Sequence, residues 1–337
     1  MARPRLARPR LARPRLLLAG AALVAASIAT GLFATAVGAQ DYPNRPIRVV
    51  VGFGPGSAAD IAARVLGIRM GQILGQQMVV ENRTGAGSSL GAEFVARAPK
   101  DGYTLFMSTV ANTINPALNK LSFDFVKDLA PIALIANVPN MLAVHPSLNV
   151  NSVPELIALA KSKPDTIAYA SSGVGTLAHL SGEMLNGLAG IKLVHVPYPG
   201  SAQGVTDVLA GRVGAIFGPS STLWPQVTGG KLKALAVTQL KRAATLPDVP
   251  TMAEAGLQNY DASVWIGLLA PAGTPREIID KLAKVANEGL ASNEVLTPLR
   301  AQGVDALGGS PEEFARYVDS ETKKWAAIAA GAGLDKK

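Results

Sequence analysis

A strand, a glycine-rich turn and a helix follow one another twice in the sequence, and this unit limits the possible folds more than any other feature. In the first unit, the apolar run 47–53 reads as a buried strand, and apolar residues recur at helical spacing after residue 57. The second unit spans residues 166–188. Further strands are predicted at residues 78–80, 103–107, 192–196, 214–217, 234–238 and 262–270. Such alternation of strands and helices predicts an α/β fold with mostly parallel sheets.

Local signals also predict where some helices begin. Thr274 and Pro275 have the residue types of an N-cap and a first helical position, for a helix after the strand 262–270. Ser57 and Asp60 have the spacing of a capping box, in which the Asp60 carboxylate would bind the Ser57 amide. A final amphipathic helix is predicted from residue 311 to about residue 330.

The first 39 residues have the order of a secretory signal peptide. Six arginines in three ARPRL repeats precede an apolar run of small residues that ends in Val37-Gly38-Ala39. This order predicts export by the general secretory route, cleavage before Gln40 and a periplasmic protein. An uncleaved membrane anchor is the alternative, because about 20 apolar residues can span a bilayer.

Charge and cysteine content argue against several classes of function. The leader carries six positive charges and no acid, so the rest of the chain keeps a net charge of +2 out of +8. A high positive charge would have been the main indication of nucleic-acid binding, and the chain after the leader does not have it. The absence of cysteine excludes thiolate catalysis and sulfur-ligated metals, and His145, His179 and His195 lack the spacing of a zinc motif. We therefore expect neither a metal nor a cofactor.

The loop after the first strand, residues 52–60, is a candidate anion site. Its glycines let the backbone approach a ligand closely. The first amides of the following helix are unpaired donors at the positive end of the helix dipole. A carboxylate could bind there without arginine or lysine. A capped helix start that serves only folding is the other interpretation.

The same loop fits a motif of nucleotide-dependent oxidoreductases. Gly54, Gly56 and Ala59 match G-x-G-x-x-A, and Glu81 lies at the end of a later strand, where an acidic residue would bind a ribose. Pro55 weakens the match, because it lies between the glycines and lacks an amide proton.

A second short pattern leaves a serine hydrolase as another form of exported α/β enzyme. Residues 87–91 match G-x-S-x-G, and all three histidines follow them in the chain. The nucleophile elbow of such enzymes places its serine directly after a strand. Ser89 is separated from the preceding strand by several residues, which argues against this function.

Three further loops have the composition of ligand sites. Residues 171–176 offer hydroxyls and amides at a helix start, Tyr198 offers a phenol, and Ser220 follows the strand that ends at Phe217. All three lie at the carboxyl ends of predicted strands, where open α/β sheets bind ligands. Turn chemistry alone is the other interpretation of each loop.

Six longer motifs give the chain a specific resemblance to a known family. They are YPNRPIRVVVGFGPGSAADIAAR, ENRTGAGSSLGAEFVARAPKDGYTL, SSGVGTLAHLSGEMLN, HVPYPGSAQGVTDVLAGRV, LAVTQLKRAATLPDVPTMAEAG and WIGLLAPAGTP. In this order and spacing, from about Tyr42 to the C-terminus, the chain resembles the Bug proteins. These are the extracytoplasmic solute receptors of tripartite tricarboxylate transporters.

The resemblance implies a periplasmic-binding-protein fold of type II, with two α/β lobes and a ligand cleft between them. Lobe one would comprise residues 41–142 and 262–337, and lobe two residues 143–261, with crossover strands near residues 138–144 and 262–269. The resemblance further implies a monomer that captures a small carboxylate without a chemical step. Its partners would be that ligand and the membrane permease subunits of a tripartite transporter, or a sensory system.

The resemblance also implies that backbone amides and ordered waters hold the ligand. The positions carried over are Phe53, Gly56, Ser57, Ala58, Asp60, Ser88, Ser171, Gly173, Thr176, Tyr198 and Ser220. Two loops depart from the family pattern. Gly52 and Ser57 stand where the family has proline and glycine, and Ser88 stands where glycine is common. The ligand can therefore differ from the dicarboxylates typical of the family.

Overall fold

The computed structural model describes residues 42–198 and 201–334. The predicted signal peptide, residues 1–39, lies outside this part of the chain, as do Pro199 and Gly200. Every helix and strand named below belongs to one compact unit, residues 43–337. A stretch with the length and hydrophobicity of a bilayer span is not found in any helix of the described residues.

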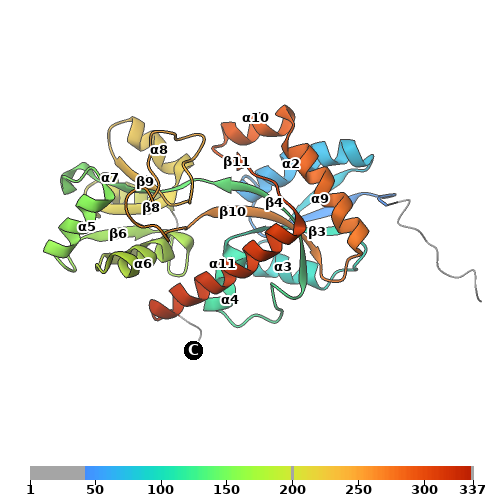
Figure 1. Ribbon diagram of the computed structural model, residues 1–337, viewed down its shortest axis with the longest axis horizontal. Coiled ribbons are helices and arrows are strands. Elements are labelled where there is room, and N and C mark those ends of the chain that lie inside the picture. The colour runs from blue at the N-terminus through green and yellow to red at the C-terminus, as the bar shows by residue number, and fades with distance from the viewer. Residues whose placement is uncertain (1–41, 199–200, 335–337) are drawn as a thin grey trace, which may run out of the picture. The chain divides into compact units, whose positions relative to one another are not determined.

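Six strands form the larger of two sheets, in the order β11-β4-β10-β3-β1-β2 (Figure 1). They are β1 (Ile47–Val51), β2 (Met78–Asn82), β3 (Thr104–Thr109), β4 (Leu129–Val138), β10 (Val264–Pro271) and β11 (Asp305–Ala306). β1 pairs in parallel with β2 and β3, whereas β10 runs antiparallel to both β3 and β4. The carboxyl ends of β1, β2, β3 and β4 therefore lie at one edge of this sheet.

Five strands form the smaller sheet, in the order β7-β6-β8-β5-β9. They are β5 (Asn140–Val144), β6 (Ala168–Ser171), β7 (Val194–Pro197), β8 (Ala215–Pro219) and β9 (Lys233–Val237). β6 pairs in parallel with β7 and β8, and β5 runs antiparallel to β8 and β9. The carboxyl ends of β6, β7, β8 and β9 therefore lie at the edge where β5 begins.

The chain passes between the sheets at two neighbouring points. β4 ends at Val138 and β5 begins at Asn140, and the chain returns to β10 after β9. Thr238 is buried and joins the two passages: its amide donates to the Asn140 carbonyl (2.9 Å) and its hydroxyl donates to the Ala262 carbonyl (2.9 Å). The strand ends of both sheets therefore adjoin the same pair of passages.

Helices lie on both faces of the sheets (Figure 1). They are α2 (Ala58–Leu74), α3 (Ser89–Ala96), α4 (Ala111–Leu118), α5 (Val153–Ser162), α6 (Leu177–Ala189), α7 (Ser201–Leu209), α8 (Ser220–Thr228), α9 (Arg276–Leu290), α10 (Asn293–Ala301) and α11 (Pro311–Gly331), with 3₁₀ turns η2 (Ala86–Ser88) and η3 (Pro146–Leu148). Because helices cover both faces, a central strand such as β1 is apolar along most of its length, with Val49, Val50 and Val51 all buried.

The α/β architecture predicted from strand and helix alternation is confirmed, but the sheets are mixed rather than mostly parallel, because β10 and β5 run antiparallel to both of their neighbours. The prediction also omits three helices. α4, α8 and α10 each contain an internal proline, at Pro116, Pro225 and Pro298. Proline lacks the amide that a helix interior uses, so it reads as a helix break in a sequence. Here each of these helices has eight or nine residues and tolerates the missing bond.

The predicted start of α9 is wrong, whereas the predicted final helix is confirmed. Thr274 is buried and its hydroxyl donates to the Pro271 carbonyl (2.8 Å), so Thr274 closes the turn after β10 instead of capping a helix. α9 begins at Arg276, and Pro275 occupies its N-cap position. α11 runs over Pro311–Gly331, close to the predicted range.

Candidate functional site

All of the residues predicted to bind a ligand lie at or after the carboxyl ends of strands. Phe53, Gly56, Ser57, Ala58 and Asp60 follow β1, Ser88 follows β2, Ser171, Gly173 and Thr176 end or follow β6, Tyr198 follows β7, and Ser220 follows β8. The structure thus brings the predicted residues of each sheet to one edge. Those edges are the ones that adjoin the passages between the sheets.

The 52–60 loop is closed by the first turn of α2. Ser57 is the N-cap, and its hydroxyl accepts a hydrogen bond from the Asp60 amide (3.3 Å). The predicted return bond is wrong: the Asp60 carboxylate accepts from the Gly56 amide (2.9 Å), while the Ser57 amide donates to the Gly54 carbonyl (3.2 Å). The φ angle of +82° at Gly56 turns that amide toward Asp60, and glycine adopts this angle without strain.

Asp60 fixes this loop instead of offering its carboxylate to solvent. Its exposed fraction is 2%, and it accepts hydrogen bonds from Arg64 Nη2 (2.9 Å) and Asn82 Nδ2 (2.9 Å). Burial works to raise the pKa of the Asp60 carboxyl, but hydrogen bonds from Arg64, Gly56 and Asn82 outweigh burial and hold the pKa below its ordinary value. The Asp60 carboxylate is therefore ionised, and its oxygens are already engaged in hydrogen bonds within the protein. Its part in ligand binding would be to hold the amides of α2 in place.

The loop after β2 adopts a strained backbone beside the 52–60 loop. Ala86, Gly87 and Ser88 have φ angles of 46°, 60° and 79° in succession. Such angles cost non-glycine residues about 1–3 kcal/mol each and persist where the surroundings fix them. Asn115 of α4 supplies that constraint, because its side-chain amide donates to the carbonyls of Ala86 (3.1 Å) and Gly87 (2.6 Å). Ser88, with an exposed fraction of 1%, contacts the side chain of Asn112.

The 171–176 loop repeats in the smaller sheet what the 52–60 loop does in the larger one. Thr176 is the N-cap of α6, and its hydroxyl accepts from the His179 amide (3.4 Å). The same hydroxyl donates to the Gly173 carbonyl (2.7 Å). The Gly175 amide donates to His179 Nδ1 (3.0 Å), as the Gly56 amide donates to Asp60.

Each of these capped helices leaves two amides for a ligand. In the described part of the chain, the amides of Ala58 and Ala59 in α2 have no acceptor, because the first bonded amide is that of Asp60. The amides of Leu177 and Ala178 in α6 are in the same position. Unpaired first-turn amides at the positive end of a helix form an anion site.

The loops of the two sheets are close to one another around α4. A side chain added at Gly175 would lie 2.5 Å from Leu118 Cδ1, so the 171–176 loop packs against the end of α4. The same helix holds the loop after β2 through Asn115. The two parts of the chain also meet at a second point. Gly303 follows α10, in the part of the chain that carries the larger sheet, and a side chain at Gly303 would lie 3.8 Å from Ser220 Oγ. The two sets of predicted residues therefore border the same region between the sheets.

Tyr198 and Ser220 are fixed by neighbours from their own sheet. The Tyr198 amide donates to the Ser171 carbonyl (3.1 Å), and its hydroxyl donates to Asp207 Oδ2 (2.8 Å). Ser220 is buried and its amide donates to the Pro139 carbonyl (2.9 Å), in the first passage between the sheets. A pocket of about 300 Å³ beside Ser220 is lined by Ser220, Ser221, Trp224, Pro225, Thr245, Leu246, Ala301, Gln302 and Gly303. This pocket therefore has walls from α8 and from the end of α10.

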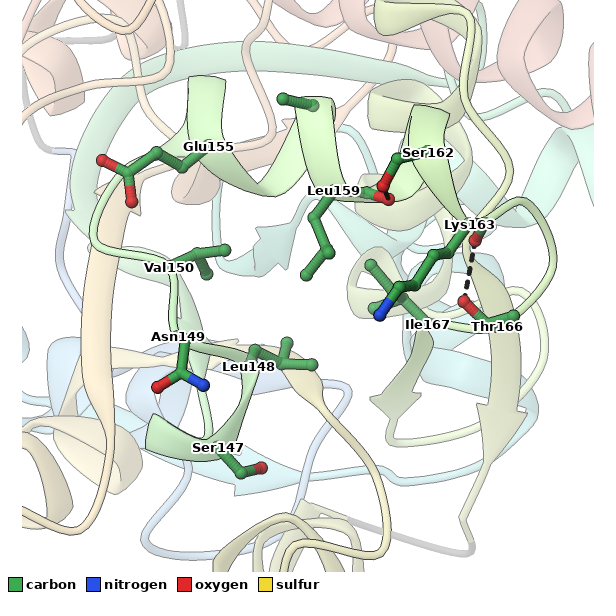
Figure 2. Close-up of a pocket in the computed structure, with 11 residues that line it drawn as sticks. Ser147, Leu148, Asn149, Val150, Glu155, Leu159, Ser162, Lys163, Thr166 and Ile167 are labelled. Carbon is green, nitrogen blue, oxygen red and sulfur yellow. Dashed lines mark hydrogen bonds between the residues drawn. The ribbon is translucent and has the colours of Figure 1, made fainter.

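A larger depression, of about 800 Å³, lies away from the strand ends. Figure 2 shows its lining, which comes from η3 and the two residues after it, from α5 and Lys163 at its C-cap, and from Thr166 and Ile167. The two latter residues precede β6, whereas the predicted residues end or follow that strand. The depression is thus at the opposite edge of the smaller sheet, and size alone does not make it the candidate site.

The structure does not support the two enzyme alternatives. Glu81, the residue required to bind a ribose, is paired with Arg83 (2.5 Å) and Arg48 (3.4 Å). The Ser89 hydroxyl accepts from Asn115 Nδ2 (3.0 Å), and Asn115 does not provide the basic nitrogen of a catalytic histidine. His145, His179 and His195 all belong to the segment that forms the smaller sheet.

Sequence reasoning missed four side chains that shape these loops. Asn82 ends β2 and binds the Phe53 carbonyl (2.9 Å) as well as Asp60, while Asn112, Asn115 and Leu118 lie on the unpredicted helix α4. Asparagine at a strand end is a signal that could have identified Asn82, because its short amide side chain can bind neighbouring loop backbone. The other three depend on a helix that its internal proline conceals.

Packing between Gly182 of α6 and Tyr169 of β6 supports the 171–176 loop. A side chain at Gly182 would lie 2.1 Å from Tyr169 Cζ, so we expect Gly182→Ala to destabilise the protein by about 1–3 kcal/mol through overpacking. Gly187 is the matched control, since a side chain there meets nothing within 4 Å, and Gly187→Ala is expected to stabilise α6 by up to about 1 kcal/mol. Chemical denaturation measures both, and equal effects of the two variants would contradict the prediction.

Comparison with known proteins gives consistent similarities over both sheets. A family model described as tripartite tricarboxylate transporter family receptor matches residues 62–334. A structure of an R. palustris protein with adipate has a TM-score of 0.73 at 35% identity, covering 88% of this chain and 99% of that one. The periplasmic binding protein BugD has a TM-score of 0.70 at 35% identity, with coverages of 88% and 100%. MatC from Rhodopseudomonas palustris with bound malate has a TM-score of 0.68 at 31% identity, with coverages of 85% and 99%.

Proposed function

The chain belongs to the family of tripartite tricarboxylate transporter receptors, and from this we propose that it is a periplasmic receptor that captures a small carboxylate between its two sheets. Family membership confirms the resemblance drawn from the sequence motifs, and the solute-binding fold is that of BugD and its relatives. Two similar proteins were solved with adipate and malate, which supports a carboxylate as the ligand class.

One observation carries the proposal: two helix N-termini, one from each sheet, offer unpaired amides at edges that adjoin the same passages. We propose that the amides of the 52–60 and 171–176 loops grip the acid group, with Ser88, Tyr198 and Ser220 completing the walls. In this proposal the two sheets correspond to two lobes. The sequence prediction places the boundary after residue 142, inside β5, whereas the pairing of β5 with β8 and β9 favours assigning the whole of β5 to lobe two.

Neutral donors suit this task because the nearby cations are already paired. Arg64 binds Asp60, and Arg83 binds Glu81 while its guanidinium stacks on the ring of Phe94 (3.6 Å to the centroid). Amides fixed by the fold need no reorganisation when the ligand arrives. They act more strongly once closure of the lobes removes water from around the acid group. Binding would thus favour the closed lobes, as required of a capture protein without a chemical step.

The proposal extends to location and partners. We propose that residues 1–39 are removed after export through the general secretory route, and that the closed monomer presents a composite surface to membrane permease subunits or to a sensory protein. Expression of the full chain, followed by N-terminal sequencing of the periplasmic product, tests the first step. The proposal expects Gln40 as the first residue, and an intact leader on membrane-bound protein would contradict it.

Equilibrium titration of the periplasmic product with adipate and malate tests the ligand class. We expect a dissociation constant of about 1 μM or tighter for at least one of them, together with compaction in small-angle scattering. Adipamide is the matched control, since it keeps the carbon chain of adipate but has no charge, and it should not bind. Turnover of a ligand, or compaction only with a nicotinamide nucleotide, would favour the enzyme alternative. Equal binding of adipamide would contradict recognition of an anion.

A further inference from the structure

His179 occupies the same place in the smaller sheet that Asp60 occupies in the larger one. Each is the third residue of the helix that follows a strand-end loop. Each accepts a hydrogen bond from the glycine before the N-cap: the Gly56 amide binds Asp60 Oδ2 (2.9 Å), and the Gly175 amide binds His179 Nδ1 (3.0 Å). Both glycines have positive φ angles, of 82° and 75°. One loop is therefore fixed by a carboxylate and the other by an imidazole.

His195 fixes the beginning of the same 171–176 loop. Its Nε2 lies 2.6 Å from the Ser171 hydroxyl, which accepts from the Gly173 amide (3.1 Å) and donates to the Gly173 carbonyl (3.1 Å). A neutral His195 with its proton on Nε2 completes this set, because the hydroxyl then accepts two hydrogen bonds and donates one. The rings of His195 and His179 are stacked, with centroids 3.8 Å apart.

The surroundings of the two histidines favour their neutral forms. Tyr169 of β6 stacks on His195 (5.1 Å between centroids) and donates to Glu183 Oε1 (2.8 Å). Glu183 of α6 is the carboxylate nearest to His179, at 3.9 Å from Nε2, and it lines a pocket to which Lys324 of α11 also contributes. Burial lowers the pKa of His179, and Glu183 opposes this only in part. Burial and the charge of His179 lower the pKa of His195 to about 4.

We propose that His179 and His195 are positioning residues of the ligand site: as neutral imidazoles they hold the 171–176 loop so that its helix amides face the ligand, and protonation of His179 releases it. This inference rests on the proposed function, because it assigns a pH-dependent control to the same site. Ligand binding by the amides of the 171–176 loop is then weakened by acid, whereas binding by the amides of the 52–60 loop is not.

The chemistry of the two acceptors explains this difference. Protonated His179 carries a hydrogen on Nδ1, which then faces the amide hydrogen of Gly175 and cannot accept it. The positive charge also lies against the stacked ring of His195. Burial holds the pKa of His179 below its ordinary value of 6.5, so the bond from Gly175 is complete above about pH 6.5 and is lost as the pH falls through the lowered value. His195 keeps the hydrogen on Nε2 when it is protonated, so its bond to the Ser171 hydroxyl does not depend on this titration. The pKa of Asp60 is lowered, so its carboxylate keeps its bond to Gly56 throughout this range.

Titration with adipate between pH 7.5 and pH 4.5 tests the proposal on the wild type, His179→Asn, His179→Ala and His145→Asn. Asparagine supplies an oxygen acceptor that does not titrate, and His145 lies at the opposite end of the smaller sheet as a control. We expect the affinity of the wild type and of His145→Asn to fall about tenfold more than that of His179→Asn over this range. His179→Ala should bind adipate weakly both at pH 7.5 and at pH 4.5, because alanine offers no acceptor to the Gly175 amide. Protonation of adipate itself affects all variants equally and cancels in the comparison.

The amide signal of Gly175 in the ligand-free protein gives a second measurement by nuclear magnetic resonance. It should shift with the titration of His179 in the wild type and stay constant in His179→Asn. If this signal titrates but adipate and malate do not bind, the proposed function is wrong and the positioning role stands. If adipate binds and the pH profile of His179→Asn follows that of the wild type, or the Gly175 signal does not follow His179, the positioning role is wrong.

Discussion

Replacement of Gly52 by alanine is expected to weaken carboxylate binding roughly 100-fold, a loss of about 2.7 kcal/mol. Gly52 is buried at the end of β1, and a side chain there would lie 1.9 Å from Ser88 Oγ, 2.6 Å from Ser88 Cβ and 2.8 Å from Ser88 Cα. The last of these atoms is backbone, so a rotamer change of Ser88 cannot relieve the contact. The loops after β1 and β2 must therefore separate, and the amides of α2 move with the first of them.

Gly54 provides the matched control two residues further along the same loop. A side chain there meets nothing within 4 Å, and its φ angle is not in the positive range. Gly54→Ala should therefore bind adipate within about twofold of the wild type, since a surface change away from such contacts costs at most about 0.5 kcal/mol. Isothermal titration at pH 7.5 measures both variants. If Gly52→Ala retained wild-type affinity while folded, the loops after β1 would have no part in binding.

A second substitution should restore part of the lost affinity. Ser88→Gly removes two of the three close atoms and also suits the φ angle of 79° at that position. The double variant Gly52→Ala/Ser88→Gly should therefore bind adipate at least tenfold more tightly than Gly52→Ala alone, a coupling that a double-mutant cycle measures. Additive effects of the two changes would contradict the proposed contact.

This contact also relates two features that the sequence shows only separately. The resemblance drawn from the sequence motifs implies a family pattern with proline at the place of Gly52 and a further glycine in the loop that contains Ser88. A proline at position 52 would place its side chain against Ser88, so glycine at 52 accommodates the serine at 88. The resemblance identifies both departures, but they are far apart in sequence and only the parallel pairing of β1 with β2 brings them together.

The fold was largely predictable because its signals are local. Apolar runs, glycine turns and helix periodicity indicate β1, β3, β6 and most other strands, and the same signals give the start of α6 at Thr176. The partners of the caps were less predictable. Asp60 and Ser57 have the spacing of a capping box, but the positive φ of Gly56 presents a different amide to the carboxylate. The role of His179 likewise depends on a ring nitrogen and a turn that residue spacing does not specify.

Glu321 of α11 lies at the centre of a buried network that ties this helix to the larger sheet. Its exposed fraction is 2%, and one carboxylate oxygen accepts from the indole nitrogens of both Trp265 (3.1 Å) and Trp325 (3.0 Å). The other oxygen pairs with Lys324. Trp265 belongs to β10, the strand by which the chain returns to the larger sheet, so the network fixes α11 against one of the two passages.

Glu321→Ala is expected to destabilise the protein by about 3–5 kcal/mol, measured by chemical denaturation at pH 7. Removing one partner of a buried ionic network leaves the other groups without compensation, here the two indole donors, while the ammonium of Lys324 keeps only its contacts with Asp261. Asp319→Ala is the matched control on the same helix, because Asp319 forms an exposed pair with Lys323 (2.6 Å) that should contribute less than about 1 kcal/mol. A loss below about 1 kcal/mol for Glu321→Ala would mean that the network is not important for stability.

Glu321→Gln separates the hydrogen bonds of this residue from its charge. Glutamine keeps a carbonyl oxygen for the indoles, so its destabilisation should be smaller than that of alanine. Burial raises the pKa of Glu321, and this effect is larger than the opposing effect of Lys324. The carboxyl of Glu321 therefore binds a proton more tightly in the folded protein than in the unfolded chain. The stabilisation from that proton is present below the ordinary glutamate pKa and is lost as the pH rises through the raised value. The wild type should therefore gain stability relative to Glu321→Gln as the pH falls from 7 to 5, and a gap that widens in the opposite direction would contradict the raised pKa.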